Sequence, residues 1–321
     1  MRSALLSVLL AVAIGTAAAA DPAYPTRPIR LIVGYPPGGA TDIAARLVGQ
    51  KLSPVFGQTV VIDNRAGASG TIAATIVAGA EPDGYTLSFA ASPETAIYRA
   101  LMKNPPYDSL KDFQPVTLVG RVPFMLVVHP SVNANTVKEL VALAKAKPGA
   151  MNFASFGNGT SNHLVGEAFR AATGINIVHV PYKGSAPALA DLLGGQVHMT
   201  FDAVPVVLPQ VKAGKLKALA VATAKRSMLA PNVPTMDESG VANFTGGTWF
   251  GVLAPARTPV TIVDKLAREI STVLRAPDVA QTFNDRGIEP VGNTPAEFRA
   301  FIESETKRWL KVAQDAGVKP E

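Results

Sequence analysis

The stretch "PIRLIVGYPPGGATDIAARLVGQKLS", residues 28–53, contains a complete strand–loop–helix unit. The apolar run at 28–34 predicts a buried strand, and the apolar positions of 40–53 recur at helical spacing on one side. The loop between them, "YPPGG" at 35–39, combines prolines and glycines, which end a strand and allow a tight turn. The unit therefore predicts a strand that leads directly into a helix packed on it.

The same unit recurs through the rest of the chain. Short loops between alternating strands and helices predict an α/β fold with parallel sheets covered by helices, rather than an all-α or all-β fold. In the first half, the expected elements are strands at 58–64 and 84–91 and a helix at 71–80. In the second half, strands at 151–155, 175–180 and 197–203 lead into helices at 162–173, 186–195 and 207–214.

Two apolar segments predict how the chain divides. "FQPVTLVGRVPFMLVV" (113–128) and "TGGTWFGVLAP" (245–255) look extended and too long for one ordinary strand. A chain of 321 residues is long enough to form two domains. We therefore expect both segments to cross between the domains, near Gly120 and Thr248. The hinges are placed near Gly120 and Gly247. The expected domains are 21–120 plus 250–321, and 121–249.

The last part of the chain is expected to be helical. Two amphipathic stretches, 258–276 and 294–317, each begin with Thr-Pro. This dipeptide is typical of a capping residue followed by proline in the first helical turn. We therefore predict that Thr258 and Thr294 cap these helices.

The first twenty residues have the layout of a secretory signal peptide. Arg2 precedes an apolar core at 4–14, and the segment ends in small residues at Ala18–Ala20. This core is well below the roughly 20 residues that span a bilayer. We expect cleavage after about Ala20 and export of the mature chain to the periplasm.

Composition excludes several classes of function. The chain has no cysteine, which rules out a cysteine nucleophile or a thiolate metal site. Removal of Arg2 lowers the formal net charge from +6 to +5, and no Lys/Arg run is present, so a nucleic-acid partner is not expected. The four histidines lack metal-ligand spacing, and no loop resembles a calcium site, so neither a metal nor a cofactor is expected.

Enzymatic chemistry finds little support. The stretch "GASG" at 67–70 has the wrong spacing for a hydrolase nucleophile turn. Ser155, His163 and Asp202 fall at strand ends or helix starts, but nothing in their spacing requires a catalytic triad. His163 lies in a first helical turn, where it would either donate to a ligand oxygen or pack against the loop.

Anion binding has the stronger case. The loops 35–42 and 155–163 are rich in glycine, serine and threonine, and each opens a helix in a different expected domain. Free N–H groups at a helix N-terminus bind anions without any cationic side chain. Two such loops across a cleft would hold both ends of a small dianion. Further candidates on the neighbouring loops are Ser69, Gly70, Tyr182 and Lys183.

Ordinary structural roles remain open for the same residues. Every α/β protein needs small residues at its strand-to-helix turns. Asp42 would repel a bound anion, so we interpret it as a cap or a helix-dipole partner whose side chain points to the backbone and not to the cleft. Asp202 would either accept a hydrogen bond from a ligand or cap the next helix.

Several stretches together resemble one known family. They are "YPTRPIRLIVGYPPGGATDIAARL", "VIDNRAGASGTIAA", "AEPDGYTL", "VPYKGSAPALADLLGGQV", "AGKLKALAVAT" and "VPTMDESG". In order and over the whole mature chain, they resemble the extracytoplasmic receptors of the tripartite tricarboxylate transporter family, also called Bug-type solute-binding proteins. No glycine of either main loop departs from the family pattern.

The resemblance implies a two-domain clamshell, joined by two crossover strands, that closes on a small carboxylate and delivers it to a membrane permease. It implies a non-enzymatic protein, and we expect a monomer. One wall would comprise Tyr35, Gly38, Gly39, Ala40 and Thr41, with Ser69 and Ser92 nearby. The other would comprise Ser155, Gly159, Thr160, Ser161 and His163, with Tyr182 and Asp202 nearby. Three alternatives remain: a sensor that engages a signalling receptor, a receptor for neutral or aromatic ligands, and an exported α/β hydrolase.

Overall fold

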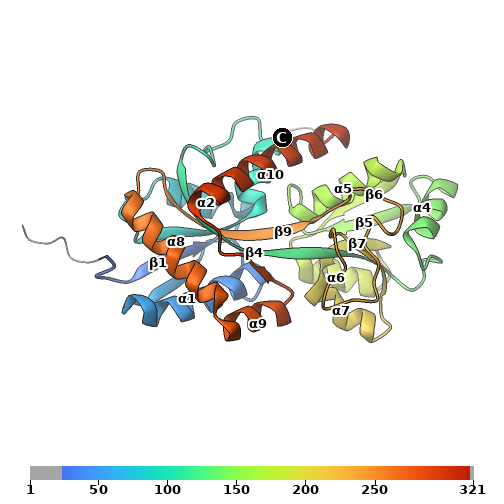
Figure 1. Cartoon of the computed structure of the whole chain (residues 1–321). Helices are drawn as coiled ribbons and strands as arrows, with labels where there is room; N and C mark the ends of the chain where they lie inside the picture. Colours follow the sequence, from blue (N-terminus) through green and yellow to red (C-terminus); the bar gives the residue numbers. More distant parts are fainter. Residues whose placement is uncertain (1–23, 319–321) are drawn as a thin grey trace, which may run out of the picture.

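The computed structural model describes residues 24–318, so the expected signal peptide lies outside the described residues. The molecule is elongated, and two long strands run lengthwise through its centre (Figure 1). These strands are β4 (Phe113–Val128) and β9 (Gly247–Pro255), which pair with each other in antiparallel fashion. The α/β halves on either side are connected through them.

The first half is built on three parallel strands. β1 (Ile29–Val33) lies between β2 (Val60–Asn64) and β3 (Thr86–Ala91). β3 pairs antiparallel with β9, which joins this half to the long strands. Its helical segments are α1 (Ala40–Phe56), η1 (Ala68–Gly70), α2 (Thr71–Ala78), η2 (Pro93–Ile97) and α3 (Tyr98–Leu101).

The second half repeats this plan. β5 (Met151–Ser155) lies between β6 (Ile177–Pro181) and β7 (Met199–Ala203), and all three are parallel. The end of β4 pairs antiparallel with both β7 and β8 (Lys217–Val221). The helices of this half are α4 (Val137–Ala146), α5 (Ser161–Thr173), α6 (Ser185–Leu193) and α7 (Val204–Lys212).

The sheet is mixed, whereas the alternating pattern predicted parallel sheets. The order along the main path is β2-β1-β3-β9-β4-β7-β5-β6, and every pair that includes β4 or β9 is antiparallel. Both crossover segments are extended, as predicted. Their antiparallel direction relative to the neighbouring strands depends on pairing with residues far away in the sequence. β4 is one continuous strand of 16 residues, because its first part pairs with β9 and its last part with β7.

The C-terminal region consists of α8 (Val260–Arg275), α9 (Pro277–Asp285), the short β10 (Glu289–Pro290) and α10 (Pro295–Asp315). As predicted, Thr294 caps α10, where it forms a capping box with Glu297. The matching prediction for Thr258 is wrong. α8 begins at Val260 without a side-chain cap, because the Thr258 hydroxyl donates to the carbonyl of Pro255, 2.8 Å away.

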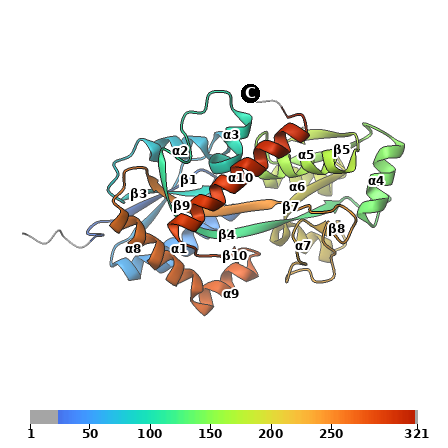
Figure 2. The ribbon, with the colours of Figure 1, turned by 45° about the horizontal axis from the view of Figure 1, so that its top comes forward.

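Helix α10 reaches across both halves of the molecule. It lies over β9 and extends to α5 (Figure 2). The guanidinium of Arg170 on α5 donates to the carbonyl of Ala316, just beyond the end of α10, at 2.6 Å. The C-terminal segment expected to belong to the first half therefore also contacts the second.

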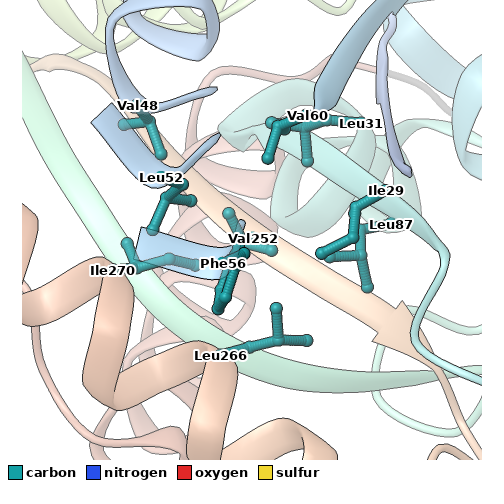
Figure 3. A pocket seen from close by; sticks show the side chains of 10 residues that line it. All are labelled: Ile29, Leu31, Val48, Leu52, Phe56, Val60, Leu87, Val252, Leu266 and Ile270. Atoms are coloured by element: carbon teal, nitrogen blue, oxygen red, sulfur yellow. The ribbon is translucent and has the colours of Figure 1, made fainter. Parts of the chain in front are cut away.

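The core of the first half is tightly packed. A small gap lies among apolar side chains of β1, β3, α1, α8 and β9, and Figure 3 shows its lining. The gap has a volume of about 10 Å³, at the lower limit for a single water, and its lining offers no polar partner. It is a packing defect of the core and not a ligand site.

Candidate functional site

The first wall of the expected cleft is the loop between β1 and α1. Asp42 is almost fully buried and accepts hydrogen bonds from Gly38 N at 2.9 Å, Arg46 Nε at 3.0 Å and Asn64 Nδ2 at 2.9 Å. Burial opposes ionisation of Asp42, but these hydrogen bonds outweigh it and lower the pKa of this carboxyl. The interpretation of Asp42 as a first-turn carboxylate that bonds the backbone is confirmed, but it is not the cap, because Gly39 occupies that position.

The helix that follows this loop begins without a side-chain cap. Gly39 occupies the capping position of α1 in an extended conformation. Because glycine has no side-chain oxygen, it cannot accept a hydrogen bond from an N–H group of the first turn. The N-terminal N–H groups of Ala40 and Thr41 thus have no capping side chain. The start of α1 is therefore a candidate for binding an anion.

Helix α5, on the second wall, begins in the same way. Thr160 is its capping residue, yet the Thr160 side chain makes no capping hydrogen bond. Its hydroxyl lies 2.6 Å from the Gly157 carbonyl and 2.8 Å from Asn162 Oδ1, so it stabilises the loop. Gly157 and Gly159 have φ of 126° and 75°, a backbone region that favours glycine. Strand-to-helix turns in both halves therefore start helices that lack a side-chain cap.

The histidines next to this loop are packed side chains. The rings of His163 and His179 stack with centroids 4.1 Å apart, and His179 Nε2 lies 2.6 Å from Ser155 Oγ. Burial lowers the pKa of both histidines to about 4, so both are neutral near pH 7. His163 Nδ1 accepts from Gly159 N at 3.3 Å, which places the hydrogen of the neutral ring on Nε2.

Residues of the two walls meet directly. Ser92, at the end of β3, has its Oγ 2.8 Å from Ser161 Oγ at the start of α5 and 2.9 Å from Thr248 Oγ1 on β9. Ser69 Oγ donates to the carbonyl of Asn158 at 3.3 Å. The structure thus brings Ser69, Ser92 and Ser161 together from distant parts of the sequence.

Two other expected site residues, Ser155 and Tyr182, form their side-chain hydrogen bonds with residues of the second half. Ser155 is fully buried and bonds His179 and Gly157. Tyr182 donates its hydroxyl to Asp191 at 2.8 Å. Lys183 is exposed, and none of the described ion pairs includes it.

Asp202 is a second buried carboxyl, on the second wall. It accepts from Ser185 Oγ at 3.0 Å and from Ala203 N at 2.6 Å, and it is 1% exposed. Burial raises the pKa of Asp202 to about 7. The triad considered from sequence is not assembled, because His179 rather than His163 contacts Ser155, while Asp202 bonds Ser185.

Sequence reasoning missed three residues that hold the walls in place. Glu94 lies behind the first wall and accepts from Tyr35 OH at 2.6 Å. Thr248 and Asn158 connect the walls through the contacts given above. The sequence could have indicated Glu94, because it is the single carboxylate within the apolar run "SFAASPETAI". Thr248 and Asn158 could be recognised as contacts between the walls only from the folded structure.

Other kinds of site are not evident in the part of the chain that the structure describes. Within residues 24–318, no cluster of three or more His, Asp or Glu side chains could hold a metal ion. A surface hollow of about 340 Å³ lies between α8 and the start of α10, away from the two walls. None of the described helices is long and apolar enough to cross a bilayer.

Two α/β halves are joined by two long strands, and glycine-rich strand-to-helix loops lie where the halves meet. This architecture is that of periplasmic binding proteins. Residues 44–318 match the model of the tripartite tricarboxylate transporter family receptor, and the chain belongs to this family. It is 40% identical to Protein BugT of Bordetella pertussis over 324 residues, which cover 99% of each chain. The family is one of solute-binding receptors, which confirms the prediction that the chain is not an enzyme.

Solved structures agree with this assignment. R. palustris Rpa4515 with adipate is 39% identical, with a TM-score of 0.87, and the match covers 93% of this chain and 100% of that one. The periplasmic binding protein BugD is 36% identical, with a TM-score of 0.84 and the same coverage. MatC from Rhodopseudomonas palustris with bound malate is 32% identical, with a TM-score of 0.82, over 90% of this chain and 99% of that one. The predicted clamshell fold is confirmed.

Proposed function

We propose that this receptor captures a small dicarboxylate in the periplasm, between its two walls, and delivers it to a membrane permease. The observation that carries the proposal is the pair of uncapped helix N-termini, α1 and α5, one on each wall. Two relatives of the same fold are described with adipate and with bound malate, both of which are dicarboxylates. A ligand with a carboxylate at each end matches two such helix ends.

The ligand would be held by neutral donors. The N–H groups at the start of α1 and α5 supply positive potential, and the Thr41 hydroxyl supplies a further donor. The hydroxyls of Ser69 and Thr160 would donate to the ligand only on leaving their present carbonyl partners, Asn158 and Gly157. Hydrogen bonds to a charged group contribute about 1.5–3 kcal/mol each, so a few of them suffice for micromolar binding. His163, with its hydrogen on Nε2, would add one more donor.

Capture would be coupled to closure of the halves. A ligand shifts a conformational equilibrium only through contacts that differ between the two states. A dicarboxylate bonded to both walls makes its full set of contacts only when the walls approach each other. The two strands β4 and β9 would carry the hinges, which we place near Gly120 and Gly247.

A thermal-shift screen of the mature chain, residues 21–321, tests the proposal. The panel would contain dicarboxylates of increasing length, their monoamides, tricarboxylates and aromatic acids. A ligand at one hundred times its dissociation constant adds about 2.7 kcal/mol of stability, which gives a clear shift in Tm. Shifts with dicarboxylates that vanish for the matched monoamides would support the proposal, and a folded chain that ignores every carboxylate would refute it.

Delivery to a permease requires a separate test. Uptake of the identified ligand would be measured in cells with and without this receptor, alongside the expression of genes that the ligand induces. Loss of uptake would support transport. Loss of induction with uptake intact would instead favour the sensing alternative.

A further inference from the structure

Glu94 connects the three loops that make up the first wall. Its Oε2 accepts from the Tyr35 hydroxyl at 2.6 Å, and its Oε1 accepts from Ala91 N at 2.6 Å, next to Ser92. On a third side it lies against Gly70, where an added Cβ would stand 2.7 Å from the carboxyl carbon. One buried carboxyl thus contacts the loops that carry Tyr35, Ser69 and Ser92.

No basic side chain compensates a negative charge on Glu94. The elements packed against η2 are β3, η1, α3 and α10, and β3 and η1 carry no ionisable side chain. On α3, Arg99 pairs with Asp108. On α10, Arg308 pairs with Glu305 and Lys311 with Asp315, Arg299 donates to the Leu110 carbonyl, and Lys307 is exposed. Within residues 24–318, none of the ion pairs includes Glu94.

The remaining ionisable groups around Glu94 are tyrosines. Tyr35 donates to its carboxylate, Tyr107 donates to its backbone carbonyl at 2.6 Å, and Tyr98 on α3 stacks against Tyr107. Burial, together with the nearby Glu94 charge, raises the pKa of Tyr35 well above its usual value, so this hydroxyl keeps its hydrogen. Glu94 is therefore the group of this cluster that changes charge at moderate pH.

The charge state of Glu94 decides where the hydrogen of the Tyr35 hydroxyl goes. An ionised Glu94 has no hydrogen to give and takes the one that Tyr35 donates. A protonated Glu94 donates to the Tyr35 oxygen, which frees the Tyr35 hydrogen for the carbonyl of Ser69 at 3.3 Å. Ser69 in turn bonds Asn158 on the opposite wall, so the change would reach the contact between the walls.

We propose that Glu94 takes up a proton when the anionic ligand binds, so that ligand capture by this receptor is proton-linked. The inference rests on the proposed function, since it requires an anion at the first wall. An ionised, uncompensated carboxylate behind that wall repels the ligand, and protonation removes the repulsion. Glu94 acts through Tyr35 and the loop of Ser69, so it is a positioning residue.

The ionisation properties of Glu94 agree with this geometry. Burial raises the pKa of Glu94 to about 7, despite hydrogen bonds from Tyr35 and Ala91 that favour the charged form. A bound anion raises this pKa further. Well below pH 7 the free receptor already holds the proton, and affinity is independent of pH. Well above pH 7 the proton must be taken up, and the rise of the dissociation constant approaches tenfold per pH unit.

Calorimetric titration with malate and with adipate, between pH 6.5 and 8.5, tests the inference. At each pH, the titration is repeated in buffers of different ionisation enthalpy, which gives the number of protons taken up per ligand. We expect nearly one proton at pH 8 and a dissociation constant about fivefold higher at pH 8 than at pH 7, because half of the free Glu94 is already ionised at pH 7. Binding with no proton uptake overturns the inference and leaves the proposed function intact.

Two variants identify the group that takes up the proton. Glu94→Gln keeps the shape of the side chain without its charge, and we expect tight binding that no longer depends on pH. Asp202→Asn is the matched control, because Asp202 is the buried, unpaired carboxyl of the opposite wall. Uptake that persists in Glu94→Gln and disappears in Asp202→Asn would overturn the assignment to Glu94.

If Glu94→Gln does not fold, Tyr35→Phe serves as the second variant that tests the inference. This change removes the hydroxyl that Glu94 bonds, and we expect weaker binding together with a shifted midpoint of the pH dependence. An unshifted midpoint would overturn the role of Tyr35 as the link. Absence of binding by any carboxylate would refute both the inference and the proposed function.

Discussion

Ser92 and Ser161 are separated by 69 positions in the sequence, and their hydroxyl oxygens lie 2.8 Å apart. Ser92 ends β3 in the first half, and Ser161 begins α5 in the second. Ser92 Oγ also lies 2.9 Å from Thr248 Oγ1, so three hydroxyls from three elements form one chain. Since a hydroxyl donates once and accepts up to twice, Ser92 satisfies both neighbours at the point where the halves meet.

Ser92→Ala would break this chain. The change leaves the hydroxyls of Ser161 and Thr248 without their shared partner, and we expect it to lower the free energy of unfolding by about 1–2 kcal/mol. If the contact forms only when the walls approach, ligand affinity falls by a similar free energy, which corresponds to about tenfold. Urea unfolding and calorimetric titration would measure the two effects.

Ser239→Ala is the matched control for that experiment. The Ser239 hydroxyl donates to the carbonyl of Thr235 within its own turn, at 2.7 Å, away from both walls. We expect its ligand affinity to equal that of the unmodified chain. Equal affinity of Ser92→Ala and Ser239→Ala would show that the Ser92 contact plays no part in closure.

Substitution of Gly39 tests whether a ligand approaches the backbone of the first wall. Gly39 has φ −77°, which any residue adopts, and an added Cβ would meet nothing closer than the Pro36 carbonyl at 3.7 Å. Gly39→Leu should therefore change the free energy of unfolding by no more than about 0.5 kcal/mol. Affinity should fall more than tenfold, because the side chain fills the space in front of the α1 N-terminus.

Gly79→Leu provides a comparable change outside the walls. Gly79 also has a negative φ, and an added Cβ would lie 3.8 Å from the Thr75 carbonyl. Denaturant unfolding and ligand titration of both variants would be run side by side. Unchanged affinity in Gly39→Leu would remove the start of α1 from the binding site.

Asp42 determines the conformation of the same loop. Asp42→Asn replaces a carboxylate that accepts from Gly38, Arg46 and Asn64 with an amide that has one acceptor oxygen. We expect the free energy of unfolding to fall by about 1–3 kcal/mol, since a buried charged acceptor of three hydrogen bonds is lost. Asp285→Asn serves as the control, because the Asp285 side chain accepts from the exposed Gln281 and, among residues 24–318, has no ion-pair partner. This change should alter stability by less than about 0.5 kcal/mol. Urea midpoints would compare them, and equal midpoints would contradict this role of Asp42.

Local patterns in the sequence were sufficient for much of the fold. The periodicity of 40–53 predicts a helix that the structure shows as α1, and the apolar run at 113–128 coincides with β4. The direction of β4 and β9 could not be predicted, because it depends on pairing with strands far away in the sequence. Thr258 was misplaced as a cap because its hydroxyl has a competing backbone partner, Pro255.

The candidate site was less predictable for the same reason. The glycine-rich loops around Gly39 and Gly159 are local features, and the sequence identified both as starting helices. Their ligand contacts remain predictions. Glu94 was overlooked because its importance comes from Tyr35 and Gly70, which precede it by more than twenty residues and reach it only in the folded chain.

The buried carboxyl of Asp202 predicts an unusual dependence of stability on pH. Its pKa is raised from 3.8 to about 7, so between these values the folded chain holds a proton that the unfolded chain has lost. Stability from this group is therefore present below pH 4 and falls as pH rises to 7, by about 4 kcal/mol for three pKa units. The neutral histidines His163 and His179 act in the opposite direction, since stability falls as pH drops below 6.5.

Asp202→Asn isolates the contribution of the carboxyl from that of the histidines. The variant keeps a side chain of the same shape and carries no charge, so its stability relative to the unmodified chain should increase steadily between pH 4 and pH 7. Urea unfolding of both chains at half-unit pH steps would give this difference directly, because the histidine contributions cancel. A difference that stays constant across the range would mean that Asp202 titrates at its ordinary pKa, and burial would then not govern this group.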